Sequence, residues 1–135
     1  DKALDYYERA LAIYVKLQTE NSVEVAEMYL RIALCNRALN EAKEEYQLLK
    51  KSLRIYKKVY GPNHYQLGQI YTEIGTYYGS RKAYDSLLHY YQIASDLWVK
   101  QLGEDHFLVA QSYDNLAKAY RNLQDSEKEY FYLWA

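Results

Sequence analysis

The sequence predicts an all-α protein built from repeated pairs of antiparallel helices, and three observations support this fold class. A sequence block recurs, because Gly61 and Gly103 lie 42 positions apart and so do His64 and His106. Apolar residues within each repeat follow helical spacing. Five glycines and one proline among 135 residues leave little chain for long irregular loops. Helix pairs in a fixed register, each contacting only its neighbours, form an α-solenoid.

The repeat covers the whole chain when the sequence is aligned with itself at a spacing of 42 residues, without gaps. Aligned sets include Tyr14, Tyr56 and Trp98; Val25, Leu67 and Val109; Tyr29, Tyr71 and Tyr113; and Ala33, Gly75 and Ala117. We therefore expect a single domain over residues 1–135. It would contain the second helix of a preceding repeat (1–18), two repeats (19–60 and 61–102) and a truncated repeat (103–135).

Each repeat resolves into two helices, which gives about seven helices in all. The first helix of each repeat is expected to begin near Val23, Tyr65 and Phe107. The second helices are expected over residues 41–60 and 83–102, with a partial one over 125–135. Short turns at 39–41, 79–81 and 123–125 would connect the two helices of each repeat. The small residue at the position of Gly75 would let a neighbouring helix approach closely.

The junctions between repeats carry helix start and stop signals. Asn21, Asn63 and Asp105 share one repeat position and are the expected N-caps, with Glu24 and Gln66 as capping-box partners. Gly61 and Gly103 are expected to end the long second helices in a left-handed conformation. Thr19 takes that position in the first copy, so we expect a less sharply defined helix end there.

Composition excludes several functional classes. The formal net charge of −1 gives no general argument for binding nucleic acid or an anionic membrane. A single cysteine, Cys35, cannot form an internal disulfide and fits a reducing compartment, so we expect a cytoplasmic protein. No run of about 18 apolar residues occurs. Because the sequence begins inside a helical pattern without an initiator methionine, we take it to be part of a larger protein.

Catalytic and cofactor motifs are missing from the sequence. It contains no glycine-rich phosphate loop, nucleophile elbow or paired zinc motif, so we expect neither an enzyme nor a bound cofactor. The recurring His64 and His106 admit a metal-binding interpretation. However, Ser22 stands at the same position of the first copy, and no cysteine or carboxylate cluster completes a tetrahedral ligand set. We therefore favour a structural role for both histidines at helix starts.

Two motifs resemble the first helix of the tetratricopeptide repeat family: Tyr71-Thr-Glu-Ile-Gly-Thr-Tyr-Tyr78 and Tyr113-Asp-Asn-Leu-Ala-Lys-Ala-Tyr120. The 42-residue period and the junction Leu102-Gly-Glu-Asp-His-Phe-Leu-Val-Ala110 look more like the kinesin light chain type of these repeats. The resemblance implies a right-handed superhelix whose first helices line a concave groove. It also implies a non-catalytic scaffold or adaptor that binds a protein or peptide segment in that groove.

The resemblance also implies which side chains face the groove. They are Glu27, Leu30, Leu34, Arg37 and Ala38 in the first repeat; Gln69, Thr72, Thr76, Gly79 and Ser80 in the second; and Gln111, Asp114, Asn115, Lys118, Arg121 and Asn122 in the third. Amide and hydroxyl side chains would bond a peptide backbone, and cationic ones would meet acidic side chains.

Other interpretations stay open at this point. The segment fits a peptide-sensing regulator, or a structural or dimerising spacer attached to an enzyme outside the chain, with self-association through the ends of the solenoid. The cations of the second helix, Lys50, Lys51, Arg54, Lys57 and Lys58, fit either a solvated face or a surface for an acidic partner.

Overall fold

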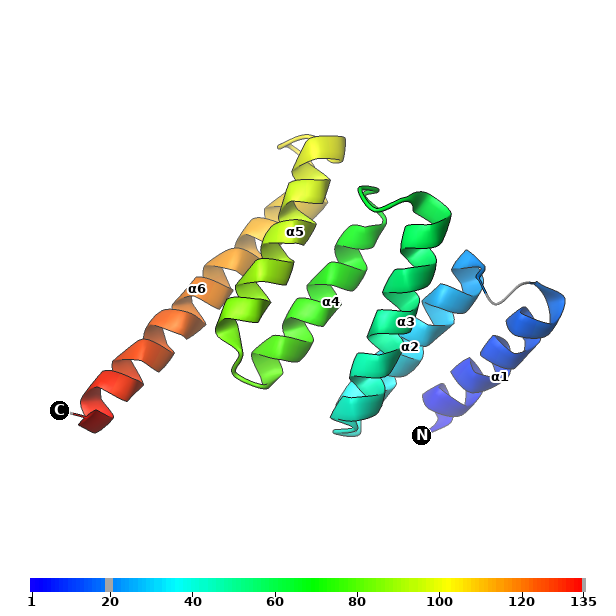
Figure 1. Ribbon diagram of the computed structural model, residues 1–135, viewed down its shortest axis with the longest axis horizontal. Coiled ribbons are helices and arrows are strands. Elements are labelled where there is room, and N and C mark those ends of the chain that lie inside the picture. Colours follow the sequence, from blue (N-terminus) through cyan, green and yellow to red (C-terminus); the bar gives the residue numbers. More distant parts are fainter. Residues whose placement is uncertain (19–20, 135) are drawn as a thin grey trace. The chain divides into compact units, whose positions relative to one another are not determined.

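The computed structural model describes the backbone of residues 1–18 and 21–134, and side chains through residue 127 (Figure 1). This part of the chain contains six helices and no strand, which confirms the all-α fold class. The helices are α1 (Lys2–Leu17), α2 (Val23–Ala38), α3 (Ala42–Tyr60), α4 (Leu67–Ser80), α5 (Tyr84–Leu102) and α6 (Phe107–Trp134). The expected end of the first helix at Thr19 lies outside the described residues.

The predicted turn at 123–125 is wrong, because α6 runs without interruption from Phe107 to Trp134. The two turns that do form place Asn40 and Lys82 at φ angles of 61° and 60°. Gln124 is the equivalent residue of the third repeat. Asparagine tolerates a positive φ, and Gly79, a poor helix former, lies near the end of α4, three residues before Lys82. The third copy has Gln124 at the position of Asn40 and Arg121 at the position of Gly79. Leu123 and Gln124 favour helix instead, so one long helix replaces the predicted two.

The chain forms two compact units, residues 1–70 and 71–135. In the first unit, α2 packs against both α1 and α3. Val25, Ala26 and Ile55 form a buried cluster that is covered by Leu11, Tyr14, Val15, Tyr29 and Tyr56. The Ser52 hydroxyl on α3 donates a hydrogen bond of 2.8 Å to the Ala26 carbonyl oxygen on α2. A buried serine therefore joins the two helices and leaves its own hydroxyl satisfied.

In the second unit, α5 packs against α6 and also contacts α4 closely at Gly75. A Cβ atom at Gly75 would lie 2.6 Å from Cδ1 of Tyr91, well inside van der Waals contact. The expected close helix approach at this position is therefore confirmed. The buried hydroxyls of Ser112 and Ser95 share a hydrogen bond of 3.0 Å between α6 and α5.

The helix caps lie one residue later than predicted. The Ser22 hydroxyl accepts a hydrogen bond from the Val25 amide at 3.3 Å and is the N-cap of α2. Nδ1 of His64 accepts from the Gln66 amide at 3.1 Å, and Nδ1 of His106 accepts from the Leu108 amide at 3.0 Å. These three residues share one repeat position, not the position predicted for the caps. An acceptor atom near free helix amides explains why serine and histidine alternate there.

Gly61 and Gly103 end α3 and α5 with φ angles of 89° and 83°, so the predicted positive φ is confirmed. Their ψ angles of 163° and 162° differ from the left-handed helical value that we expected. This extended region with positive φ is accessible essentially to glycine alone. The amide of each glycine still donates back to its helix, to Lys57 and Val99 respectively.

Candidate functional site

Some of the predicted groove residues, but not Arg37 or Ala38, meet in the first unit at a hollow of about 280 Å³ formed by α2, the end of α3 and the start of α4. It is lined by Val23, Glu27, Leu30, Arg31, Leu34, Tyr56, Tyr60, Gln66 and Gln69. Four of these nine were predicted from the sequence: Glu27, Leu30, Leu34 and Gln69. We call this site the α2–α3 hollow.

The α2–α3 hollow has an apolar side on α2 and an aromatic wall on α3. Leu30 is buried, and Leu34, one turn further on, is partly exposed. Tyr56 and Tyr60 stack with ring centroids 6.1 Å apart, and Tyr60 stacks in turn on His64 at 4.6 Å. Because the rings support one another, the wall is held in place before any ligand arrives.

One end of the hollow is polar. Nη2 of Arg31 donates to Oε1 of Glu27 at 3.1 Å, and this hydrogen bond raises the pKa of Arg31. Burial, and secondarily the Glu27 carboxylate, raise the pKa of Tyr56 to about 12. Tyr56 therefore keeps its hydroxyl proton at neutral pH. Gln66 and Gln69 add exposed amide groups that both donate and accept hydrogen bonds.

Arg37 was also predicted to face the groove, but the structure places it in an ion pair with Glu45. Nε of Arg37 lies 2.7 Å from Oε2 of Glu45, whose side chain is 4% exposed. In the next repeat Gly79 and Leu87 occupy these positions, and a Cβ added at Gly79 would lie 3.1 Å from Cδ2 of Leu87. Arg37 therefore joins α2 to α3 and is absent from the lining of the hollow.

The predicted groove residues of the second unit lie on α4 and α6. The Thr76 hydroxyl hydrogen-bonds both the Thr72 carbonyl oxygen, at 3.0 Å, and the Tyr91 hydroxyl, at 2.7 Å. On α6, Lys118 and Asp114 form an exposed ion pair of 2.9 Å. Asn115 is partly buried, and the remaining predicted residues Gln111, Arg121 and Asn122 are exposed. Thr76 thus has a packing role, whereas the α6 side chains face solvent.

Sequence reasoning missed five lining residues: Val23, Arg31, Tyr56, Tyr60 and Gln66. The two tyrosines were missed because the groove was assigned to first helices alone, and the other three because they fall outside the groove positions that the resemblance implies. A signal for the aromatic wall was available. Tyr56 and Tyr60 are four residues apart, and Tyr56 shares its repeat position with Tyr14 and Trp98. Aromatic residues one turn apart at the end of a second helix lie on the same helix face.

The described residues form neither a metal-ligand cluster nor a membrane-spanning helix. Within the described part of the chain, no three histidine, cysteine or carboxylate side chains gather as a metal-ligand set. Among the same residues, every helix is either too short or too polar to cross a lipid bilayer.

Comparison with known proteins gives one family match, over the first part of the chain. Residues 1–58 match the tetratricopeptide repeat family model. No curated protein sequence matches the chain.

Solved structures share the fold, and two of them are as follows. BtubC (BKLC) from P. vanneervenii matches with a TM-score of 0.78 and 21% identity, over 95% of this chain and 51% of that one. A kinesin light chain candidate from Podosopora anserina with nearly identical TPR-like repeats matches with a TM-score of 0.78 and 18% identity, over 94% of this chain and 60% of that one. The chain therefore spans between half and two thirds of the length of these structures.

The sequence match and the shared fold agree with the 42-residue period and with the close helix contact at Gly75. Residues 1–58 thus resemble tetratricopeptide repeats in sequence, and the chain shares its fold with structures that are described as kinesin light chain-like.

Proposed function

We propose that this chain is a non-catalytic interaction scaffold or adaptor of the cytoplasm that binds a peptide segment of a partner protein. The α2–α3 hollow is the proposed anchor site. Its support is the convergence of four predicted groove residues with two stacked tyrosines around one concavity.

The size of the hollow admits one large apolar anchor on its α2 side, although polar groups make up most of its lining. A cavity of about 150 Å³ lined by apolar side chains accommodates one benzene ring. The volume of about 280 Å³ therefore admits one or two ring-sized groups. Such a side chain would rest on Leu30 and Leu34 beside the tyrosine wall, and Gln69 would bond the backbone next to it.

The proposal extends to the groove positions of the second unit. Within that unit, the exposed Gln111, Lys118 and Arg121 would contact a peptide segment. Lys118 already pairs with Asp114, so binding an acidic side chain there would exchange one exposed ion pair for another at little net gain.

The experiment is a selection of peptides from a displayed random library against the 135-residue chain, followed by affinity measurement with the variant Leu34→Lys. Leu34 is partly exposed, so a lysine there is tolerated by the fold but places a charged group in the hollow. We expect selected peptides to share a large apolar residue and to bind this variant at least tenfold more weakly, a loss of about 1.4 kcal/mol.

The matched control is Glu24→Lys, which adds a lysine to an exposed position of the same helix outside the hollow. It should bind the selected peptides as the unmodified chain does. Equal binding by the unmodified chain and Leu34→Lys would contradict the proposed anchor site.

A further inference from the structure

A second surface lies on α3, outside the α2–α3 hollow. All six cations of this helix, Lys43, Lys50, Lys51, Arg54, Lys57 and Lys58, are exposed. At 3.6 residues per turn they fall within an arc of about 120° and extend over about 22 Å along the axis. We call this surface the basic face. No aspartate or glutamate occurs in the sequence between Glu45 and Glu73.

The fold itself does not require the basic face, as the other repeats show. Shifting the six positions by 42 residues gives Asp85, Gln92, Ile93, Asp96, Val99 and Lys100 on α5. Shifting them the other way gives Asp1, Glu8, Arg9, Ala12, Val15 and Lys16 in and beside α1. Neither set is basic, although both helices belong to the same repeat architecture. The positive charge is therefore a property of α3 alone.

Helix electrostatics explain only part of the charge. Lys57 and Lys58 stand in the last turn of α3, where cations interact favourably with the helix dipole. Lys50 and Arg54 lie in the middle of the helix, where the dipole has no such effect. Nζ of Lys51 lies over the Tyr29 ring, and Lys51 also lines a second hollow together with Glu8 and Glu44. Lys50, Arg54 and Lys57 are therefore the centre of the basic face.

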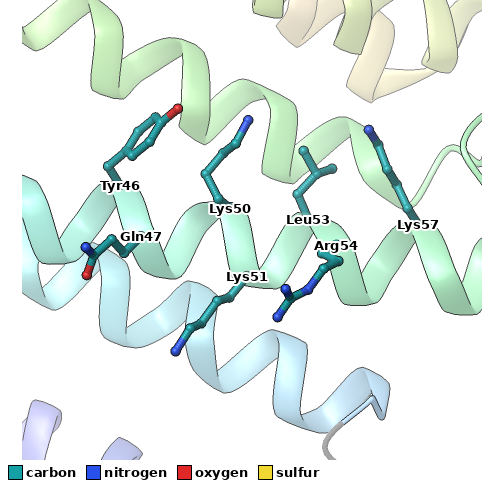
Figure 2. Close-up of a pocket in the computed structure, with 7 residues that line it drawn as sticks. All are labelled: Tyr46, Gln47, Lys50, Lys51, Leu53, Arg54 and Lys57. Carbon is teal, nitrogen blue, oxygen red and sulfur yellow. The ribbon is translucent and has the colours of Figure 1, made fainter.

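A hollow of about 780 Å³ lies against this centre (Figure 2). Its lining residues on α3 are Tyr46, Gln47, Lys50, Lys51, Leu53, Arg54 and Lys57. In Figure 2, Lys50 and Lys57 extend from one side of the helix, on either side of Leu53, whereas Arg54 extends from the other side. Cationic groups thus flank a concavity that has an aromatic ring, Tyr46, at one end.

We propose that the basic face binds a short acidic segment of a partner protein. Lys50 and Lys57 extend from the same side of α3 and lie seven residues apart, about 10.5 Å along the axis. Carboxylates three residues apart in an extended peptide lie about 10 Å apart, and those on alternate residues lie about 6.7 Å apart. Because lysine side chains are long and flexible, carboxylates at either spacing would reach both ammonium groups, and Arg54 would meet a further carboxylate from the other side of the helix.

The concavity and the overall charge favour a short peptide over larger polyanions. A long nucleic acid would extend beyond α3 over the remaining chain, which is acidic because the whole chain has a net charge of −1. One face of the Tyr46 ring lies beneath Nζ of Lys50, at 5.8 Å, where a stacking base would need to lie.

The test measures binding of a fluorescein-labelled peptide of alternating glutamate and serine, long enough to span about 22 Å, to the 135-residue chain. A peptide with glutamine in place of glutamate is the uncharged comparison. At an ionic strength of about 0.01 M, where the Debye length is about 30 Å, the acidic peptide should bind and the uncharged one should not. The triple variant Lys50→Glu, Arg54→Glu, Lys57→Glu should bind at least tenfold more weakly, about 1.4 kcal/mol.

The matched control is the triple variant Lys2→Glu, Lys16→Glu, Lys100→Glu, which makes the same change of net charge at exposed lysines outside the basic face. It should retain at least half of the affinity. The proposal is overturned if the acidic peptide does not bind, or if both triple variants lose affinity equally. It is equally overturned if oligothymidylate or phosphatidylserine vesicles bind through α3 more tightly than the peptide. The variant Leu34→Lys should not affect acidic-peptide binding, which separates this surface from the α2–α3 hollow.

Discussion

The ion pair between Arg37 and Glu45 makes a sharp prediction about stability. The Glu45 side chain is 4% exposed, whereas that of Arg37 is 26% exposed. Replacing Arg37 by methionine leaves a carboxylate in the interior without its cation. Removing one partner of a buried pair costs about 3 kcal/mol or more. Replacing Glu45 by leucine leaves a guanidinium that still reaches water, so we expect a loss of about 1 kcal/mol or less.

The double variant Arg37→Met, Glu45→Leu should be nearly as stable as the unmodified chain. Well-packed apolar replacements of a buried ion pair are often neutral or stabilising. The protein itself contains such a replacement, since Gly79 and Leu87 take these positions in the next repeat.

Urea unfolding followed by circular dichroism gives the free energy of unfolding of all three variants. The reasoning is refuted if Arg37→Met costs less than about 1 kcal/mol. It is also refuted if the double variant loses as much stability as Arg37→Met alone. Either result would mean that Glu45 does not depend on Arg37 for its burial.

The remaining predictions concern the junctions and Tyr56. Gly103→Ala should destabilise the chain by about 1–3 kcal/mol through its backbone conformation alone, since no atom lies within 4 Å of a Cβ there. Thermal unfolding measures this loss of stability, and an unchanged midpoint would contradict the prediction. His106→Leu removes the acceptor for the Leu108 amide and should lower the free energy of unfolding by about 1 kcal/mol. His106→Ser should keep most of this stability, because serine accepts such a bond at Ser22 in the first repeat. Equal stabilities of the two variants in urea would exclude a capping role for His106. Because the pKa of Tyr56 is raised to about 12, the unfolded chain loses this proton first. The free energy of unfolding should therefore fall as pH rises from about 10 to about 12, and that of Tyr56→Phe should fall less steeply. Urea titrations at successive pH values measure both slopes, and identical slopes would contradict the raised pKa.

The repeat period predicted most of the fold. An ungapped 42-residue alignment placed the second helices within one residue of their observed bounds, because Gly61 and Gly103 stop both at equivalent positions. It failed where the copies differ locally. The third copy has Gln124 where the first has Asn40 and Arg121 where the second has Gly79, so the helix continues through Gln124.

Atomic detail at the junctions was beyond pattern reasoning. Asparagine and aspartate are the commoner caps, so propensity pointed to Asn63 and not to His64. Only the geometry of the imidazole showed which residue accepts the helix amide.

Only part of the candidate site was predicted, because the family positions concern one helix of each repeat. Family positions on the first helix located Leu30 and Leu34, yet they gave no account of Tyr56 and Tyr60, which come from the second helix. Arg37 was assigned to the groove because it holds one of the groove positions that the resemblance implies, but its partner Glu45 lies eight residues away on α3. No pattern along a single helix contains that pairing.

The most direct test of the central claim is a map of amide chemical shifts on the 135-residue chain as a library-selected peptide is added. The largest changes should occur at Glu27, Leu34, Tyr60 and Gln69, which line the α2–α3 hollow on three successive helices. Glu24, on the same helix as Leu34 but outside the hollow, should change little. Changes concentrated away from these residues, or none at saturating peptide, would contradict the assignment of the hollow as the peptide site.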